Sequence, residues 1–190
     1  MIQQVLDNFA QKVVKAARLN VGATRTITYN DGKKARRRIS NSGQLLNSIG
    51  YSLSVKQNRD AQGRFQSGNE IRLSFEMEDY GQYLDEGVDG TKYKVKEGTR
   101  FGYTKKQPPI KDIRAWMKQR NFRLRDLKTN SFIPTTESGL QGAAYAISRK
   151  IKERGLPRTA FLQTPFNLEF DQLPPELLDA LGDDFLNAIK

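Results

Sequence analysis

The chain has 190 residues, 37% of them hydrophobic, a formal net charge of +11, and neither cysteine nor histidine. This length is enough for one hydrophobic core without disulfide bonds. The missing residue types exclude disulfides, thiolate zinc sites and the commonest general base, histidine.

The first predicted element is an amphipathic helix over residues 2–19, where apolar side chains recur at steps of three and four. Residues 24–40 then alternate on both sides of Asn30-Asp31-Gly32, a sequence typical of a tight hairpin turn. Basic side chains occupy both faces of this segment. We therefore expect a projecting basic arm rather than a core hairpin.

Two further strands follow in the sequence. Residues 42–55 begin with one helical turn and continue as an alternating strand, and residues 69–78 alternate in the same way. We expect these strands to form an antiparallel hairpin. The polar connection between them, residues 58–68, predicts a second projecting loop.

Three helices are predicted in the second half. Residues 107–121 begin with two prolines and carry an apolar stripe that includes Trp116, which we expect to be a core residue. Residues 137–154 form a helix that ends at Gly155. Residues 173–190 form a proline-started amphipathic helix, whose apolar side chains are Leu177, Leu178, Leu181, Phe185 and Ile189.

Catalytic motifs are weak throughout the sequence. The adjacent carboxylates Asp85 and Glu86 point to different faces of a helix or strand, so they do not form an acid/base pair. A metal-dependent nuclease would need Asp79, Asp85 or Glu86, but their spacing matches no such site. We assign no catalytic residue, cofactor or metal.

No signal peptide or membrane-spanning stretch is visible, so we expect an intracellular product without membrane contact.

Charge is distributed in blocks along the chain. Residues 1–40 have a net charge of +7, residues 41–99 of −2, residues 100–158 of +11 and residues 159–190 of −5. Such alternation suits a protein that contacts a polyanion on one surface and other proteins elsewhere, while a solvated basic face without a partner is the alternative. No nucleic-acid-reading motif is present, so any nucleic-acid contact would be independent of base sequence.

The order of five segments resembles the tail-completion or neck proteins of tailed bacteriophages. The segments are SGQLLNSIGYSLSV (42–55), YGQYLDEGVDG (80–90), QPPIKDIRAWMKQRN (107–121), AAYAISRKIKERG (143–155) and LPRTAFLQTPF (156–166). The resemblance covers about residues 1–166. The basic hairpin at 24–40, the insert between the second and third segments, and the acidic C-terminal helix depart from the family pattern.

The resemblance implies an α+β fold in which N-terminal, central and C-terminal helices pack on an antiparallel sheet with projecting hairpin arms. One domain would span residues 1–166, and the acidic helix in 167–190 would pack on it or on a neighbour. The function implied is structural, without enzymatic activity. The chain would form a homo-oligomeric ring, a hexamer or dodecamer, assembled in the host cytoplasm and located in the virion neck between the portal or connector and the tail.

The implied partners are the connector or adaptor, the tail tube or tail terminator, and packaged double-stranded DNA that passes through the ring during ejection. Candidate DNA- or partner-facing residues are Arg25, Lys33, Lys34, Arg36, Arg37, Arg38, Arg59 and Arg64. Candidate subunit-interface residues are Tyr80, Tyr83, Asp85, Glu86, Arg158 and Phe161. Whether an arm faces DNA or a neighbouring ring stays open, as does an ordinary surface turn at Asp85 and Glu86. The alternative function is sequence-nonspecific nucleic-acid binding.

Overall fold

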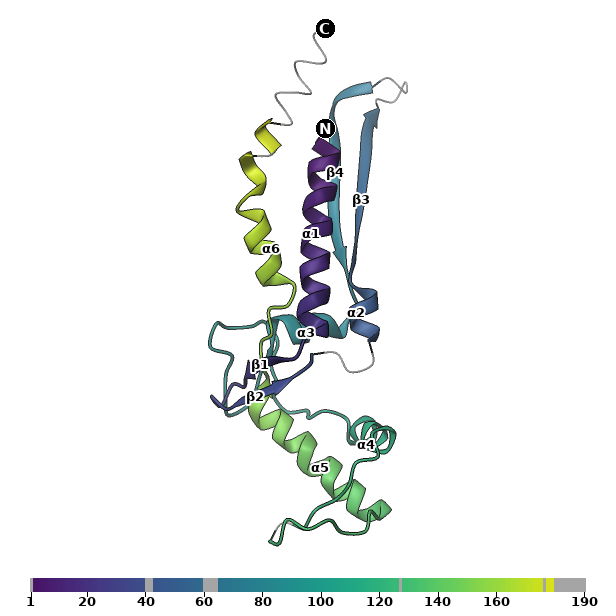
Figure 1. Cartoon of the computed structure of the whole chain (residues 1–190), viewed down its shortest axis with the longest axis vertical. Helices are drawn as coiled ribbons and strands as arrows, with labels where there is room; N and C mark the ends of the chain where they lie inside the picture. The colour runs from purple at the N-terminus through teal and green to yellow at the C-terminus, as the bar shows by residue number, and fades with distance from the viewer. Residues whose placement is uncertain (1, 40–42, 60–64, 127, 176, 180–190) are drawn as a thin grey trace. The chain divides into compact units, whose positions relative to one another are not determined.

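The computed structural model describes residues 2–39, 43–59, 65–126, 128–175 and 177–179 (Figure 1). Helices and short two-stranded sheets alternate along the chain, which confirms the α+β class. The elements are α1 (Ile2–Gly22), β1 (Arg25–Thr28), β2 (Lys34–Arg37), α2 (Gln44–Ser48), β3 (Gly50–Arg59), β4 (Phe65–Glu76), α3 (Tyr80–Glu86), β5 (Val88–Asp89), α4 (Ile110–Gln119), α5 (Glu137–Arg154), β6 (Gly155–Leu156) and α6 (Gln163–Phe170).

The chain divides into two compact units. Unit 1 comprises Met1–Arg25, Arg36–Asp85 and Thr159–Lys190, and unit 2 comprises Thr26–Ala35 and Glu86–Arg158. The segments of unit 2 have their own apolar core around Met117. The single domain over residues 1–166 and the separate helix in 167–190 stay predictions.

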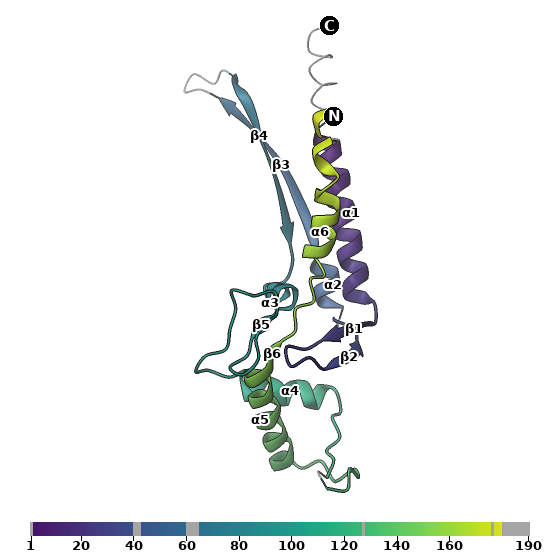
Figure 2. The same cartoon turned by 90° about the vertical axis from the view of Figure 1, so that its left-hand side faces the viewer.

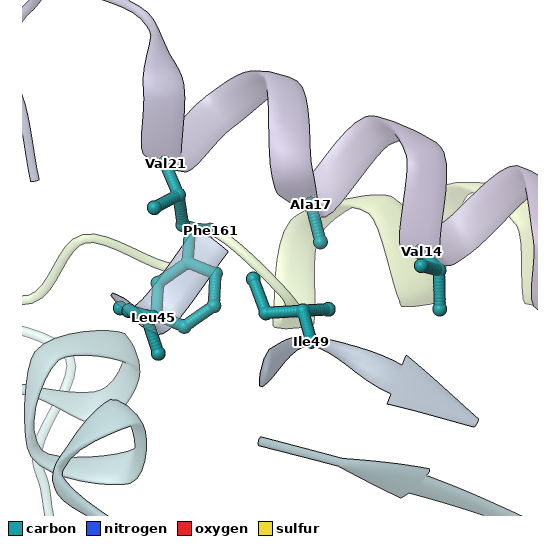
Figure 3. Packing of buried hydrophobic residues seen from close by; sticks show 6 residues of the cluster. All are labelled: Val14, Ala17, Val21, Leu45, Ile49 and Phe161. Carbon is teal, nitrogen blue, oxygen red and sulfur yellow. The ribbon is translucent and has the colours of Figure 1, made fainter. Parts of the chain in front are cut away.

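The helix α1 organises unit 1. Its predicted amphipathic face is confirmed, since Val14, Ala17 and Val21 are buried against Leu45 of α2, Ile49 and Phe161 (Figure 3). Phe161, Leu45 and Ile49 are almost completely enclosed. This cluster joins segments that are more than 100 residues apart in sequence.

The strands β3 and β4 form the predicted antiparallel hairpin (Figure 2). Tyr51 pairs with Phe75 and Leu53 with Leu73, so apolar residues face each other in the ladder. Phe75 also contacts Phe9 of α1 and Phe166 of α6 edge to face, with ring centroids 6.2 and 5.8 Å away. These aromatic contacts fix one side of the hairpin on the two helices.

The helix α6 packs on α1 and runs antiparallel to it (Figure 1). The Asn20 side-chain amide donates to the Phe161 carbonyl at 3.2 Å, whereas Lys12 lies 3.7 Å from Glu169 in an ion pair. Beyond α6, residues 173–175 and 177–179 are also helical, and Leu173 and Leu177 extend the apolar contact around Phe9. The remainder of the predicted C-terminal helix lies outside the described residues.

In unit 2, α4 and α5 pack on each other around Met117. Thr136 caps the start of α5 by accepting a hydrogen bond from the Gly139 amide at 3.1 Å. The fully buried Ser148 donates to the Pro108 carbonyl at 2.6 Å, which fastens the segment before α4 to the middle of α5.

The prediction that Trp116 is a core residue is wrong. Its side chain is 44% exposed and lies beside Phe122, whereas Met117 is fully buried and Ile110 and Ile113 pack around it. The apolar stripe of α4 is therefore narrower than the sequence suggested, because α5 covers only the Met117 side of the helix.

Candidate functional site

The segment YGQYLDEGVDG contains the adjacent carboxylates Asp85 and Glu86, and it has a structural role in the fold. Its residues form α3 and then β5. The Asp85 carboxylate is only 7% exposed and accepts hydrogen bonds from the amides of Leu162, at 2.8 Å, and Gln163, at 3.5 Å. These amides begin α6, so Asp85 caps that helix from a distant part of the sequence.

The end of α3 adds further bonds to the same segment. The Leu84 carbonyl accepts from the Thr159 amide at 3.0 Å and from the Thr159 hydroxyl at 2.5 Å, and the Asp85 carbonyl accepts from the Ala160 amide at 3.0 Å. We call this set of bonds between residues 84–85 and 159–163 the α3–α6 joint. It ties together two of the five segments that carry the resemblance.

Two of the residues predicted at a subunit interface serve the interior of this chain instead. Phe161 has no exposed surface and packs in the α1 core, and the Asp85 carboxylate is satisfied within the joint. Neither side chain is free to meet a neighbouring subunit in this fold. The sequence could not show this, because the atoms that enclose them come from segments about 75 residues or more away.

The other predicted interface residues are more accessible. Tyr80 and Tyr83 are 39% and 44% exposed on α3. Glu86 forms an ion pair with Arg100 at 3.0 Å, and Arg158 is half-buried. Tyr80 and Tyr83 thus stay available as interface candidates.

Arg25 was predicted to face DNA or a partner, but its guanidinium is fastened within unit 1. It donates a hydrogen bond to the Thr159 carbonyl of the α3–α6 joint. Partial burial lowers the pKa of Arg25, and the nearby negative charge of Asp85 partly opposes that effect. Arg25 therefore contacts the joint within its own chain, and its contact with DNA or a partner stays a prediction.

The predicted turn of the basic arm is confirmed, but its tip does not project freely. Tyr29 donates its amide to the Lys33 carbonyl at 2.8 Å, and Gly32 adopts a positive φ of 78° in the turn. Asp31 forms a nearly buried ion pair with Arg154 of α5, and the Arg154 guanidinium also lies 4.6 Å from the centre of the Tyr29 ring. The Asn30 side chain donates to the Val88 carbonyl at 3.1 Å. The tip is therefore docked within unit 2.

The docked tip leaves the remaining basic residues of the arm on the surface. Lys33, Lys34, Arg36, Arg37 and Arg38 are all exposed. Of the two basic residues predicted in the second arm, Arg59 ends β3 and Arg64 lies outside the described residues. The exposed basic arm is consequently the most concentrated of the predicted polyanion-facing sites that the structure describes.

A second basic surface was missed in the sequence. The guanidinium carbons of Arg123 and Arg125 lie 4.0 and 4.1 Å from the centre of the Phe132 ring, which is 48% exposed. The Asp126 carboxylate accepts hydrogen bonds from the amides of Thr129 and Lys128, and these bonds lower the pKa of its carboxyl. They also hold the turn that connects Arg125 to Phe132. Arg125 and Phe132 form an isolated β-bridge. A single bridge produces no alternating pattern of residues, so the sequence did not indicate it.

In the part of the chain that the structure describes, no group of three or more acidic residues could hold a metal ion, so Asp79, Asp85 and Glu86 do not converge on one. Among the same residues, no helix is long and apolar enough to cross a membrane.

Comparison with known proteins identifies no relative. No protein-family model matches the sequence, and neither the curated proteins nor the solved structures include a match to it.

Proposed function

We propose that this chain is a structural virion protein of a tailed bacteriophage, a subunit of a homo-oligomeric ring in the neck between the portal or connector and the tail. The packaged DNA passes through the lumen of this ring. The observation that supports the proposal is the order of five sequence segments, which resembles that of neck and tail-completion proteins.

The α3–α6 joint supports this reading of the segments. Asp85, in the second segment, caps the helix entered from the fifth, and the backbone of residues 84–85 bonds to residues 159–160. In unit 2, β5 of the second segment pairs with β6, where the fourth segment ends and the fifth begins, with Val88 opposite Leu156. Segments that form joints with each other are expected to occur together and in a fixed order.

The charge distribution supports assembly into a ring. A closed ring requires two different, complementary patches on each subunit. The chain has an exposed basic arm at 33–38 and an acidic C-terminal block, so opposite charges are available in separate segments of the sequence. Phosphate contacts by exposed Lys and Arg would be independent of base sequence, as passage of a genome requires.

Quantitative mass spectrometry of purified phage particles tests this proposal. We expect the chain to be a component of the particle in a fixed copy number that matches a closed ring, six or twelve, relative to the portal and tail proteins. Its absence from particles, while it is abundant in infected cells, would contradict a structural role.

Sequence-nonspecific nucleic-acid binding is the second candidate. The exposed arm and the Arg123–Phe132–Arg125 cluster favour it, because arginines beside an exposed ring suit phosphates and stacked bases. In that case the purified chain would bind free duplex with an affinity that falls steeply with salt, and glutamine at Lys33, Lys34, Arg36 and Arg38 would flatten the salt dependence. A neck subunit would bind free duplex weakly.

A further inference from the structure

Unit 1 has an open groove on the side of α1 that faces away from α6. Its volume is about 920 Å³, and it is lined by α1, α2 and the start of β3. The lining residues are Gln11, Val14, Lys15, Arg18, Leu19, Gly22, Ala23, Leu46, Gly50 and Tyr51. Most of these residues are apolar or present carbon atoms, and Leu19 is 65% exposed. An exposed apolar hollow of this kind marks an interaction surface.

The edge of the groove is positively charged. The Arg18 guanidinium donates two hydrogen bonds to the Ile49 carbonyl, at 2.7 and 3.1 Å. This acceptor is neutral, so the contact does not neutralise the positive charge of Arg18. Lys15 is exposed and forms no ion pair with any residue that the structure describes. The groove therefore suits an occupant that combines apolar side chains with negative charge.

The C-terminal segment of this protein has that composition. Residues 177–190, LLDALGDDFLNAIK, place Leu177, Leu181, Phe185 and Ile189 four residues apart, on one face of a helix, and carry three aspartates but one lysine. Leu178, at the start of this segment, is 69% exposed. At Leu178, therefore, the segment has apolar surface that its own chain does not cover.

The described start of this segment, residues 177–179, lies outside the groove of its own chain. Because α6 is antiparallel to α1, Leu173 and Leu177 lie against Phe9 near the start of α1. The groove is formed by the later turns of α1, up to Ala23, on the opposite side of the helix. Leu19 is ten residues beyond Phe9, about 15 Å along the helix axis. The end of the described chain near Leu177 is therefore separated from the groove of the same chain.

We propose that the acidic C-terminal segment, residues 178–190, of one subunit docks in the groove of α1, α2 and β3 on a second copy of the chain. Leu181, Phe185 and Ile189 contact the Leu19 and Leu46 region, and Asp183 and Asp184 lie toward Lys15 and Arg18. Donor segment and acceptor groove are different surfaces, so this contact is head-to-tail and can close a ring. The inference builds on the proposed function by naming a contact between ring subunits.

Cysteine pairs test the contact directly, because the natural chain contains no cysteine. Two full-length variants, Ala23→Cys in the groove and Ala188→Cys on the apolar face of the tail, are mixed and treated with a short bis-maleimide. The matched control mixes Ala23→Cys with Ala180→Cys, a position that the apolar spacing of the tail predicts on the opposite helical face. We expect a covalent dimer from the first mixture in a yield roughly tenfold above the control.

Sedimentation of the full chain gives a second measurement. Leu19→Asp, at an exposed position in the groove, is expected to weaken self-association roughly tenfold, whereas Gln4→Asp, exposed on α1 outside the groove, leaves it unchanged. Equal dimer yields in the two mixtures would overturn the inference. A purified chain that stays monomeric would overturn it as well. None of these results alters the copy number in particles, which tests the proposed function separately.

Discussion

At the scale of single residues, a carboxylate predicted at a subunit interface has a structural role within the chain. Asp85 is buried because the first amides of α6 need an acceptor and no residue preceding α6 supplies a side-chain cap. Arg25 joins the same site through the Thr159 carbonyl. A polar cluster of this kind stabilises the fold only while each partner is present.

The first prediction concerns this carboxylate. Asp85→Ala leaves the Leu162 amide without its acceptor, and it should lower the free energy of unfolding by about 1–3 kcal/mol. Urea unfolding measures this loss, and amide hydrogen exchange at Leu162 should accelerate. Glu97→Ala, at an exposed carboxylate, should change stability by less than about 0.5 kcal/mol. Equal stability of the two variants would show that the joint contributes little.

The second prediction concerns two glycines of α5, one inside the helix and one at its end. Gly155 ends α5 with a φ of 75°, and a Cβ there would lie 2.0 Å from the Val88 carbonyl oxygen. Gly155→Ala should therefore destabilise the protein by at least about 1–3 kcal/mol. Gly142→Ala, inside α5 with no atom near the added methyl group, should instead raise stability by up to about 1 kcal/mol. Thermal unfolding of both variants checks the opposite signs.

At the scale of elements, contacts with Arg154 of α5 and Val88 of β5 hold the turn of the basic hairpin. Burial raises the pKa of the Asp31 carboxyl, but hydrogen bonds from Arg154 and from the Lys33 amide outweigh that effect and hold the pKa below its ordinary value of 3.8. A carboxylate with a lowered pKa stabilises the fold above its unfolded pKa, and this contribution is lost as pH falls through the folded value.

The third prediction follows from that sign. Asp31→Asn should lower the unfolding temperature at pH 7, while the difference from the natural protein should shrink as pH falls below about 3.8. Circular dichroism melts over pH 3–7 measure this. Asp112→Asn, an exposed carboxylate on α4, should cause no comparable loss at pH 7. A constant difference across the pH range would mean that the ion pair does not hold the hairpin.

Local patterns in the sequence predicted many of these elements. The spacing of apolar residues predicted α1, the alternation predicted the β3–β4 hairpin, and Gly155 marked the end of α5. What could not be predicted depends on distant partners, such as the pairing of Asp31 with Arg154 123 residues later. The exposure of Trp116 was missed for the same reason, since the width of the covered stripe depends on α5.

At the scale of the whole molecule, the structure distinguishes side chains that are buried in the fold from side chains that are accessible for the proposed assembly. Phe161 is fully buried in unit 1, whereas Tyr83 is 44% exposed on α3. Both were candidates for a subunit interface from the sequence. The structure separates them, because an enclosed side chain contributes to folding and an exposed aromatic one can contribute to contacts between subunits.

The fourth prediction uses this separation. Phe161→Ala should lower the free energy of unfolding of the isolated chain by about 3–5 kcal/mol, because it empties the α1 core. Tyr83→Ala should cost less than about 0.5 kcal/mol in the isolated chain but reduce ring formation. Urea unfolding and sedimentation of the same samples compare the two effects. A Tyr83→Ala chain that assembles normally would remove this residue from the interface.

The most direct measurement of the proposed role is electron cryomicroscopy of intact phage particles, with the chain traced in the density of the neck. We expect a closed ring of identical copies at the junction of head and tail, with the exposed basic arm at 33–38 directed toward the DNA or an adjoining ring. Density at that junction that is fully accounted for by other proteins would contradict the account.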